Sequence, residues 1–306
     1  MALLDAYRRQ VALLVRVLPF VASEPDFALK GGTAINLFIR DLPRLSVDID
    51  LTYLPVADRT SSIAAIDAAM LRIAEKIGKG IKGAKASPSR LQPENAVTKL
   101  VVRHEGVQIK IEVTPVLRGA VYAPALRAVS PRVEDAFGFA EIQVTSFADL
   151  YAGKIVAALD RQHPRDLFDV RDLLAHEGID ETLRTAFLVY TLSHPRPIAE
   201  LLAPTRRVLD AEYVRGFEGM TEEAVPLDTL IKAREAIIGA MVADMPEAHR
   251  AFLLRFKQGS PDWTPLGIAE AADLPAVRWK LHNLAQLPIE KRAALAARLE
   301  RVLFPE

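Results

Sequence analysis

Two aspartates separated by one apolar residue, downstream of a double glycine, most constrain what this chain can fold into. Lys30-Gly-Gly-Thr33 predicts a turn into a helix over residues 33–39, and Val-Asp-Ile-Asp-Leu at residues 47–51 predicts a short strand. Side chains alternate between the two faces of a strand, so Asp48 and Asp50 share one face and the apolar residues share the other. Neighbouring carboxylates repel each other, and a cation between them removes that cost. Carboxylate oxygens are ligands that Mg²⁺ accepts, so the pattern predicts a Mg²⁺ (or Mn²⁺) site.

The glycines predict an anion site beside this pair. Gly31 and Gly32 leave backbone N–H groups open at a helix start, where phosphates are favoured. Together with Thr33, Arg44 and Ser46 they predict a cradle for a nucleoside triphosphate. The simpler interpretation is an edge strand with a solvated face, but the residues upstream of the aspartates favour a nucleotide site.

This combination of motifs resembles a known superfamily. The Gly-Gly … Asp-x-Asp order is similar to that of the DNA polymerase beta-like nucleotidyltransferases, although the gap between Thr33 and Val47 is slightly longer than usual. Lys-Gly-Gly-Thr-Ala … Arg-x-Ser-x-Asp-Ile-Asp-Leu resembles one branch, the AbiEii/AbiGii toxin nucleotidyltransferases, which include the MenT toxins. The resemblance implies an α/β fold, in which a small mixed-sheet nucleotidyltransferase core with flanking helices is followed by an all-helical C-terminal domain.

A third carboxylate is expected on a neighbouring strand. Residues 97–104 and 107–114 alternate strongly and are separated by Glu105-Gly106, which predicts a hairpin. Glu112 then lies on the polar face of the second strand and is a candidate third metal ligand. The alternative is a solvated glutamate beside Lys110. In the superfamily a third carboxylate occupies such a strand, although aspartate is the commoner residue there.

Two consecutive helices, predicted over residues 147–160 and 164–174, carry the second group of candidates. Lys154 shares a helix face with Arg161, and Asp166 shares one with Asp169. Lysine is a strong point-charge ligand for phosphate, so the pattern is compatible with a catalytic pocket. For arbitrary helices, a surface network of salt bridges is the more usual explanation.

The same block extends the resemblance. Asp-Leu-x-Ala-x-Lys, followed by Arg-Asp-Leu-x-Asp, looks like the third motif of the AbiEii family. That resemblance implies that Lys154 and Asp169 are catalytic, that Lys154 also contacts the nucleotide, and that Asp166 supports them.

The charge and the composition of the chain limit the kinds of ligand that it can bind. The chain of 306 residues has a formal net charge of zero, so only a local patch could attract RNA. Residues 76–103 hold seven basic residues against Glu94 alone, a local +6. Residues 79–93 read as a mobile loop, and Lys79, Lys82 and Lys85 are its candidate RNA contacts; a solvated loop is the alternative. The absence of cysteine excludes disulfides and thiolate metal sites.

The remaining sequence predicts organisation and location. The segment after Gly178 reads as helices divided by prolines, so the predicted domains are 1–178, the nucleotidyltransferase core, and 179–306, a helical domain. Trp279, Leu281 and Leu284 are expected to be packing anchors. No signal peptide or membrane span is evident, which predicts a cytoplasmic protein without membrane contact.

These features together predict transfer of a nucleoside monophosphate from an NTP to an acceptor hydroxyl. The resemblance implies an RNA acceptor, such as a tRNA 3′ end. It also implies a toxin of a bacterial toxin–antitoxin and phage-defence system, with a cognate antitoxin. Two alternatives remain at this point: a non-catalytic NTP sensor or RNA-binding module, and a small-molecule nucleotidyltransferase.

Overall fold

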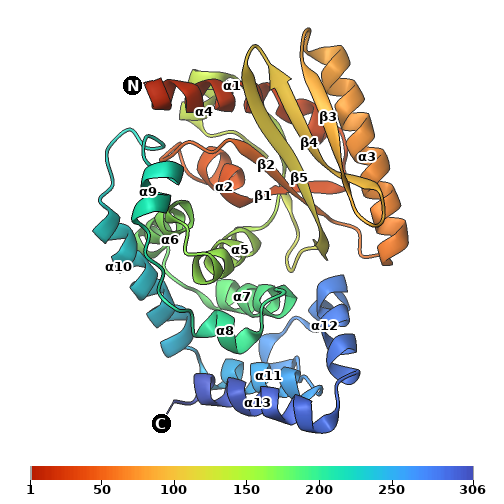
Figure 1. Ribbon diagram of the computed structural model, residues 1–306, viewed down its shortest axis with the longest axis vertical. Helices are drawn as coiled ribbons and strands as arrows, with labels where there is room; N and C mark the ends of the chain where they lie inside the picture. Colours follow the sequence, from red (N-terminus) through yellow and green to blue (C-terminus); the bar gives the residue numbers. More distant parts are fainter. Residues whose placement is uncertain (1, 306) are drawn as a thin grey trace. The chain divides into compact units, whose positions relative to one another are not determined.

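A mixed sheet of seven strands organises the first part of the chain (Figure 1), as seen in a computed structural model that describes residues 2–305. The strands are β1 (Phe27–Lys30), β2 (Asp48–Tyr53), β3 (Lys85–Leu91), β4 (Ala96–His104), β5 (Val107–Arg118), β6 (Ala125–Ala128) and β7 (Glu141–Val144). They lie in the order β3-β4-β5-β2-β1-β7-β6. β2 runs parallel to β5, and β1 runs parallel to β7, whereas the other neighbours are antiparallel. The predicted α/β fold is confirmed.

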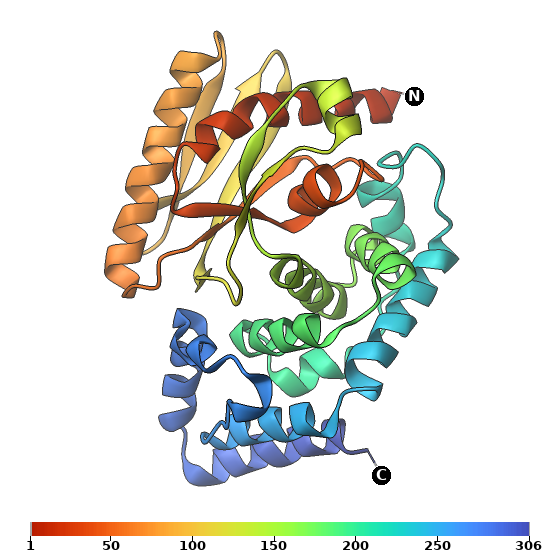
Figure 2. The ribbon, with the colours of Figure 1, turned by 180° about the vertical axis from the view of Figure 1, so that it is seen from behind.

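Helices bury one face of this sheet. They are α1 (Ala2–Ala22), α2 (Gly31–Ala34) with the π-helical turn η1 (Ile35–Ile39), α3 (Arg59–Gly80) and α4 (Pro131–Phe137). α1 and α3 lie on the same side of the central strands (Figure 2). The alternating apolar residues of β2 and β5, including Ile49, Leu51 and Ile111, point to that side and are fully buried. The polar residues of the same strands therefore occupy the opposite face.

The chain divides into two compact units. The first takes in the chain through Leu150 and also the later segment Phe217–Ala224. The second takes in Tyr151–Gly216 and the chain from Val225 onward. The sequence predicts a nucleotidyltransferase core of residues 1–178 and a helical domain of residues 179–306, and this functional division stays a prediction. The two compact units divide the chain at other residues.

The second unit is helical, as the proline spacing predicts. Its elements are most of α5 (Phe147–Asp160), α6 (Pro164–His176), α7 (Glu181–Ser193), α8 (Ile198–Leu202), α9 (Asp210–Gly216), α10 (Leu227–Ile238), η2 (Gly239–Ala243), α11 (Glu247–Gln258), η3 (Thr264–Leu266), η4 (Ala269–Asp273), α12 (Pro275–Ala285) and α13 (Ile289–Leu303). Pro226, Pro246 and Pro288 are the N-cap residues of α10, α11 and α13, while Pro275 is the first residue of α12. Proline suits these positions because the first turn of a helix leaves its N–H groups unbonded.

Three local predictions are wrong. Residues 79–93 are not a loop, because α3 continues to Gly80 and β3 follows as an edge strand paired to β4. The helix expected from Thr33 starts at Gly31, so the glycines form its first turn. Trp279 does not pack into the core: its side chain is 62 % exposed and its ring stacks on His282.

Within residues 2–305, no helix combines the length and the apolar character that crossing a membrane requires.

The β4–β5 hairpin offers a test of the fold. Glu105 and Gly106 both have positive φ, at 48° and 75°, which the two-residue turn requires. A glutamate in this conformation is strained, and asparagine tolerates it better. We expect Glu105→Asn to raise the free energy of unfolding by about 0.5–1 kcal/mol, measured by urea denaturation. Glu105→Gln is the matched control and should give no gain; an equal gain in both would show that loss of the charge is responsible.

Candidate active site

The turn from β1 into α2 lies directly against the second aspartate of β2. Gly31 has φ +75°, and a Cβ atom there would lie 2.7 Å from Oδ2 of Asp50. A Cβ on Gly32 would lie 2.8 Å from Nη2 of Arg44 and 3.0 Å from Oγ of Ser46. A side chain at either glycine would therefore prevent the backbone of this turn from approaching these residues so closely. The predicted nucleotide-binding residues are neighbours in space.

Asp48 and Asp50 share the polar face of β2, as predicted, and both are half-buried. The position of β2 relative to α2 is fixed by Thr33, whose hydroxyl donates a hydrogen bond to the backbone carbonyl of Asp48. The same hydroxyl lies 3.0 Å from that of Ser46. A fully buried threonine thus joins the glycine turn, the loop before β2 and the aspartates.

The sheet places four charged side chains in one row. Lys30 on β1 is the register partner of Asp50, Asp50 is that of Glu112, and Glu112 is that of Lys99. Cross-strand partners share a face, so two carboxylates lie between two lysines. Burial lowers the pKa of Lys30, and the nearby Asp50 carboxylate opposes that shift. Lys30 was not assigned a role from the sequence, although its register opposite Asp50 follows from the β1–β2 pairing.

The donors present suit a divalent cation only in part. Asp48 and Asp50 offer carboxylate oxygens on an open face, and the missing Cβ of Gly31 leaves room beside one of them. These features fit Mg²⁺, which binds a few carboxylates and keeps several waters. Glu112, however, forms an ion pair with Lys99. Among the described residues, no group of three His, Cys, Asp or Glu side chains is placed to hold a metal ion. Glu112 as a third ligand stays a prediction.

The loop that carries Arg44 and Ser46 is held by the returning segment Phe217–Ala224. The backbone N–H of Leu45 donates to the carbonyl of Met220 over 2.8 Å. Glu222, in the same segment, accepts from Arg132 at 3.0 Å. Arg44 itself is only 3 % exposed. This support was not predicted, because no local pattern in residues 217–224 indicates a distant partner.

A second charged cluster lies in the second unit, between α5 and α6. Nζ of Lys154 lies 2.8 Å from Oδ1 of Asp166 and 3.0 Å from Oδ2 of Asp169. All three side chains are at least 94 % buried, with exposed fractions of 6 %, 1 % and 0 %. Lys154 thus faces both aspartates of the following helix, whereas the catalytic role of the three residues remains a prediction. The surface-network alternative is wrong for these three, because they are buried.

Arg161 completes the charge balance of this cluster. Its Nε and Nη2 donate to the two oxygens of Asp166 at 2.6 and 3.0 Å. Burial alone would raise the pKa of Asp166, but Lys154 and Arg161 together hold that pKa well below its usual range. Two cations and two carboxylates thus form a locally neutral group, which makes burial tolerable.

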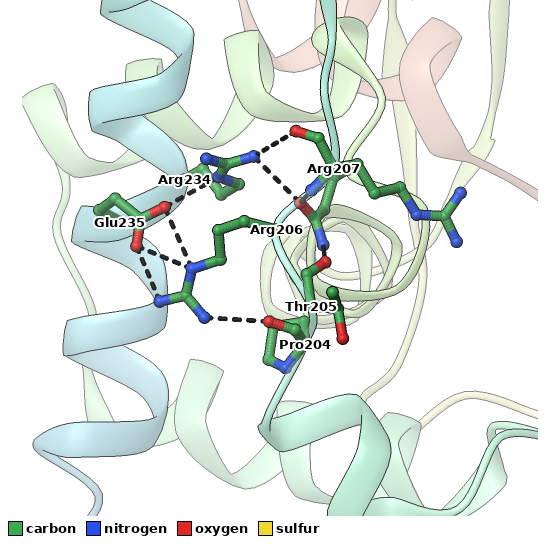
Figure 3. A network of polar contacts seen from close by, with 7 residues as sticks. Pro204, Thr205, Arg206, Arg207, Arg234 and Glu235 are labelled. Carbon is green, nitrogen blue, oxygen red and sulfur yellow. Dashed lines mark hydrogen bonds and ion pairs between the residues drawn. The ribbon is translucent and has the colours of Figure 1, made fainter.

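A polar network fixes the turn that follows Arg161 (Figure 3). Gln162 has φ 52° and is buried; its amide donates to the carbonyl of Thr205 at 2.8 Å. Nη1 of Arg234 donates to Oε1 of Gln162 and to the carbonyl of Arg207, at 3.2 and 2.9 Å. Glu235 accepts from Arg206 and from Arg234 (Figure 3). These contacts offset the backbone strain at Gln162. They also fix the position of the backbone next to Arg161.

The predicted RNA contacts divide into two kinds. Lys79 lies in the last turn of α3 and pairs with Glu75 at 2.6 Å. Lys82 follows α3 and Lys85 begins β3; both are exposed. Their proposed contact with RNA stays a prediction.

Comparison with known proteins identifies the family. Residues 12–283 match the family described as nucleotidyl transferase AbiEii toxin, type IV toxin–antitoxin system. This chain belongs to the AbiEii nucleotidyltransferase toxin family. The expected resemblance is confirmed, and with it the assignment of the chain as a nucleotidyltransferase.

A solved structure supports the fold. The chain is similar to MenT4, a nucleotidyltransferase toxin from Mycobacterium tuberculosis H37Rv, with a TM-score of 0.62 and 16 % sequence identity. The match covers 96 % of this chain and 95 % of that one. No curated protein sequence matches the chain. At this identity, the likeness to MenT4 shows a shared fold.

The N-cap of α6 gives a pH-dependent prediction. Nδ1 of His163 accepts from the N–H of Arg165 at 3.2 Å, and burial, with the charge of Arg165, lowers the His163 pKa to about 4. The unfolded chain, with an ordinary pKa near 6.5, binds this proton first, so stability is lost as pH falls from about 6.5 toward 4. We expect His163→Asn, which can still cap α6, to remove about 1–2 kcal/mol of the stability difference between pH 7 and pH 5.

Urea denaturation at both pH values measures this effect. His282→Asn, at an exposed histidine on α12, is the matched control for the replacement of a histidine by asparagine. An equal difference in wild type and His163→Asn would contradict the prediction.

Proposed function

We propose that this nucleotidyltransferase moves a nucleoside monophosphate from an NTP to the hydroxyl of an RNA acceptor, such as a tRNA 3′ end. The acceptor oxygen attacks the α-phosphorus, the bond to the β-phosphate breaks, and pyrophosphate leaves. The observation that carries the proposal is the close approach of the Gly31 turn to Asp50, because backbone N–H groups at such a turn would bind phosphate directly beside the carboxylate pair. The wider role is that of a bacterial toxin with an antitoxin partner, acting in phage defence in the cytoplasm.

Asp48 and Asp50 would hold the Mg²⁺ or Mn²⁺ ion, with Glu112 as an additional ligand if its pair with Lys99 opens. Such an ion would supply charge stabilisation at the phosphates and a more acidic acceptor hydroxyl. The backbone N–H groups of Gly31 and Gly32 would bind phosphate oxygens of the NTP. Lys30, half-buried opposite Asp50, would add a positive charge there. Thr33, Arg44 and Ser46 would complete the nucleotide cradle and, since all three are buried, would also hold this turn in place.

The family resemblance supports a catalytic role for Lys154, Asp169 and Asp166. Lysine is suited to stabilising charge that develops on a transferred phosphate. In the structure its charge is matched by the two aspartates, which would orient the ammonium group. A purely structural role for this cluster is the competing explanation, and the second experiment below separates the two.

Isosteric removal of the carboxylate charges tests the proposed metal pair. We expect Asp48→Asn and Asp50→Asn each to reduce transfer of α-labelled NTP onto total bacterial RNA by 100-fold or more, because several kcal/mol of transition-state stabilisation are lost. Both side chains are half-exposed, so the circular dichroism spectrum should not change. The same variants should relieve growth inhibition at equal protein levels. Wild-type-like transfer by either variant would contradict the assignment, and absence of transfer by the wild type would contradict the proposed reaction.

A comparison of two cations tests the second cluster. We expect Lys154→Gln to lower kcat far more than Arg161→Gln, because only Lys154 matches the family motif. Lys154 is buried between two carboxylates, so its replacement is also expected to cost roughly 3–5 kcal/mol of stability. Activity is therefore compared at a temperature where circular dichroism shows both variants folded. Small and equal losses of kcat under those conditions would favour the structural role.

A further inference from the structure

The polar face of the sheet continues beyond the aspartates as a basic surface on β5, β4 and β3. Lys85 on β3 is the register partner of Arg103 on β4, and Arg103 is that of Gln108 on β5. Lys110 lies two residues further along β5 and so shares the face with Gln108. Lys85, Arg103 and Lys110 therefore project from one face of three adjacent strands.

This basic surface starts at the aspartate pair. Lys110 is the register partner of Asp48, within one continuous sheet of the first unit. Neighbouring strands lie about 4.8 Å apart, so β3 lies roughly 14 Å from β2. Lys110, Arg103 and Lys85 thus extend from Asp48 over a distance comparable to a few nucleotides.

The three side chains are open to a ligand. Lys85 and Arg103 are exposed and Lys110 is half-exposed. Among the described residues, none of the three has a recorded ion pair or side-chain hydrogen bond. Of the other cations of the same basic stretch, Lys76 pairs with Glu24 and Arg90 lies 3.6 Å from Asp67 on α3, whereas Lys82 is exposed just beyond α3.

A further cation on β4 is also matched. Lys99, which lies in the row of Asp50, is paired with Glu112. Lys110, Arg103 and Lys85 therefore form a path of unpaired positive charge from Asp48 toward the β3 edge.

We propose that this open face of β5, β4 and β3 binds the phosphodiester backbone of a single-stranded polynucleotide, whose terminal hydroxyl reaches the aspartates. The inference rests on the proposed function and adds to it the surface that binds the acceptor. A single strand fits because the three cations follow one narrow path, and unpaired ends can lie along a sheet. Ribose and deoxyribose strands share the phosphate chemistry, and the experiment distinguishes them.

The test compares two triple variants with the same change of charge. One is Lys85→Gln/Arg103→Gln/Lys110→Gln on the proposed surface. The control is Arg215→Gln/Lys232→Gln/Arg255→Gln, three exposed side chains on α9, α10 and α11. Fluorescence anisotropy of a labelled 12-nucleotide single-stranded RNA is measured against salt, without NTP.

We expect the first variant to reduce the magnitude of the log Kd against log salt slope by about 2, since each phosphate contact on a single strand contributes about 0.7. The control should keep the wild-type slope. If the triple variant does not fold, Lys85→Gln and Arg103→Gln are measured singly, with about 0.7 lost in each.

The outcomes separate this inference from the proposed reaction. Equal slopes in wild type and surface variant, equal losses in both triple variants, or equally tight binding of a blunt RNA duplex would overturn the inference. With a single-stranded DNA of the same sequence, the surface variant should show the same reduction of the salt slope. A reduction seen with RNA alone would show that ribose contacts rather than phosphates are involved. Because binding is measured without NTP, failure of nucleotide transfer in the wild type would count against the reaction alone.

Discussion

Repulsion between carboxylates on adjacent strands is the constraint around which the first unit is arranged. Asp50 and Glu112 are register partners, and Asp48 lies two residues away on the same face. Lys30 and Lys99 lie on the outer sides of this row, on β1 and β4. The four charges can be accommodated together only if β1, β2, β5 and β4 keep this order and this register.

The apolar residues enforce the same register. Ile49 and Leu51 alternate with the aspartates and are fully buried under the helical layer. A slip by one residue would turn them to the polar face and would bury both carboxylates, at a cost of several kcal/mol. Core packing thereby fixes the position of the charges. The glycine turn adds a steric limit, because no side chain larger than hydrogen fits between Gly31 and Asp50.

Local patterns predicted the parts of the fold that depend on neighbouring residues. Strand alternation gave β2 and the β4–β5 hairpin, and prolines gave the helix starts of the second unit. β3 was missed because an edge strand with an exposed face can be built from Lys, Ser and Pro, which also favour loops. β6 and β7, with four residues each, are too short for a periodic pattern to identify.

In the candidate site, too, the features that depend on neighbouring residues could be predicted and those that depend on distant residues could not. Helical spacing indicated that Asp166 and Asp169 share a face of one helix, and both of them pair with Lys154 of the preceding helix. Their near-complete burial depends on the surrounding helices and could not be derived from spacing. Lys30 was missed because its importance comes from cross-strand pairing, and the support from Met220 was missed because it joins residues 175 positions apart.

The return of Phe217–Ala224 to the first unit affects how the protein forms during synthesis. When Leu150 has been made, all strands of the sheet exist, but the carbonyl that accepts from Leu45 does not. Ribosomes add about 5–20 residues per second, so the 74 residues from 151 to 224 take roughly 4–15 s more. The loop bearing Arg44 and Ser46 cannot be locked before then. A newly synthesised chain therefore has an incomplete first unit until Met220 has been made. A nascent chain interrupted before Met220 lacks the hydrogen bond that holds this loop to the rest of the unit.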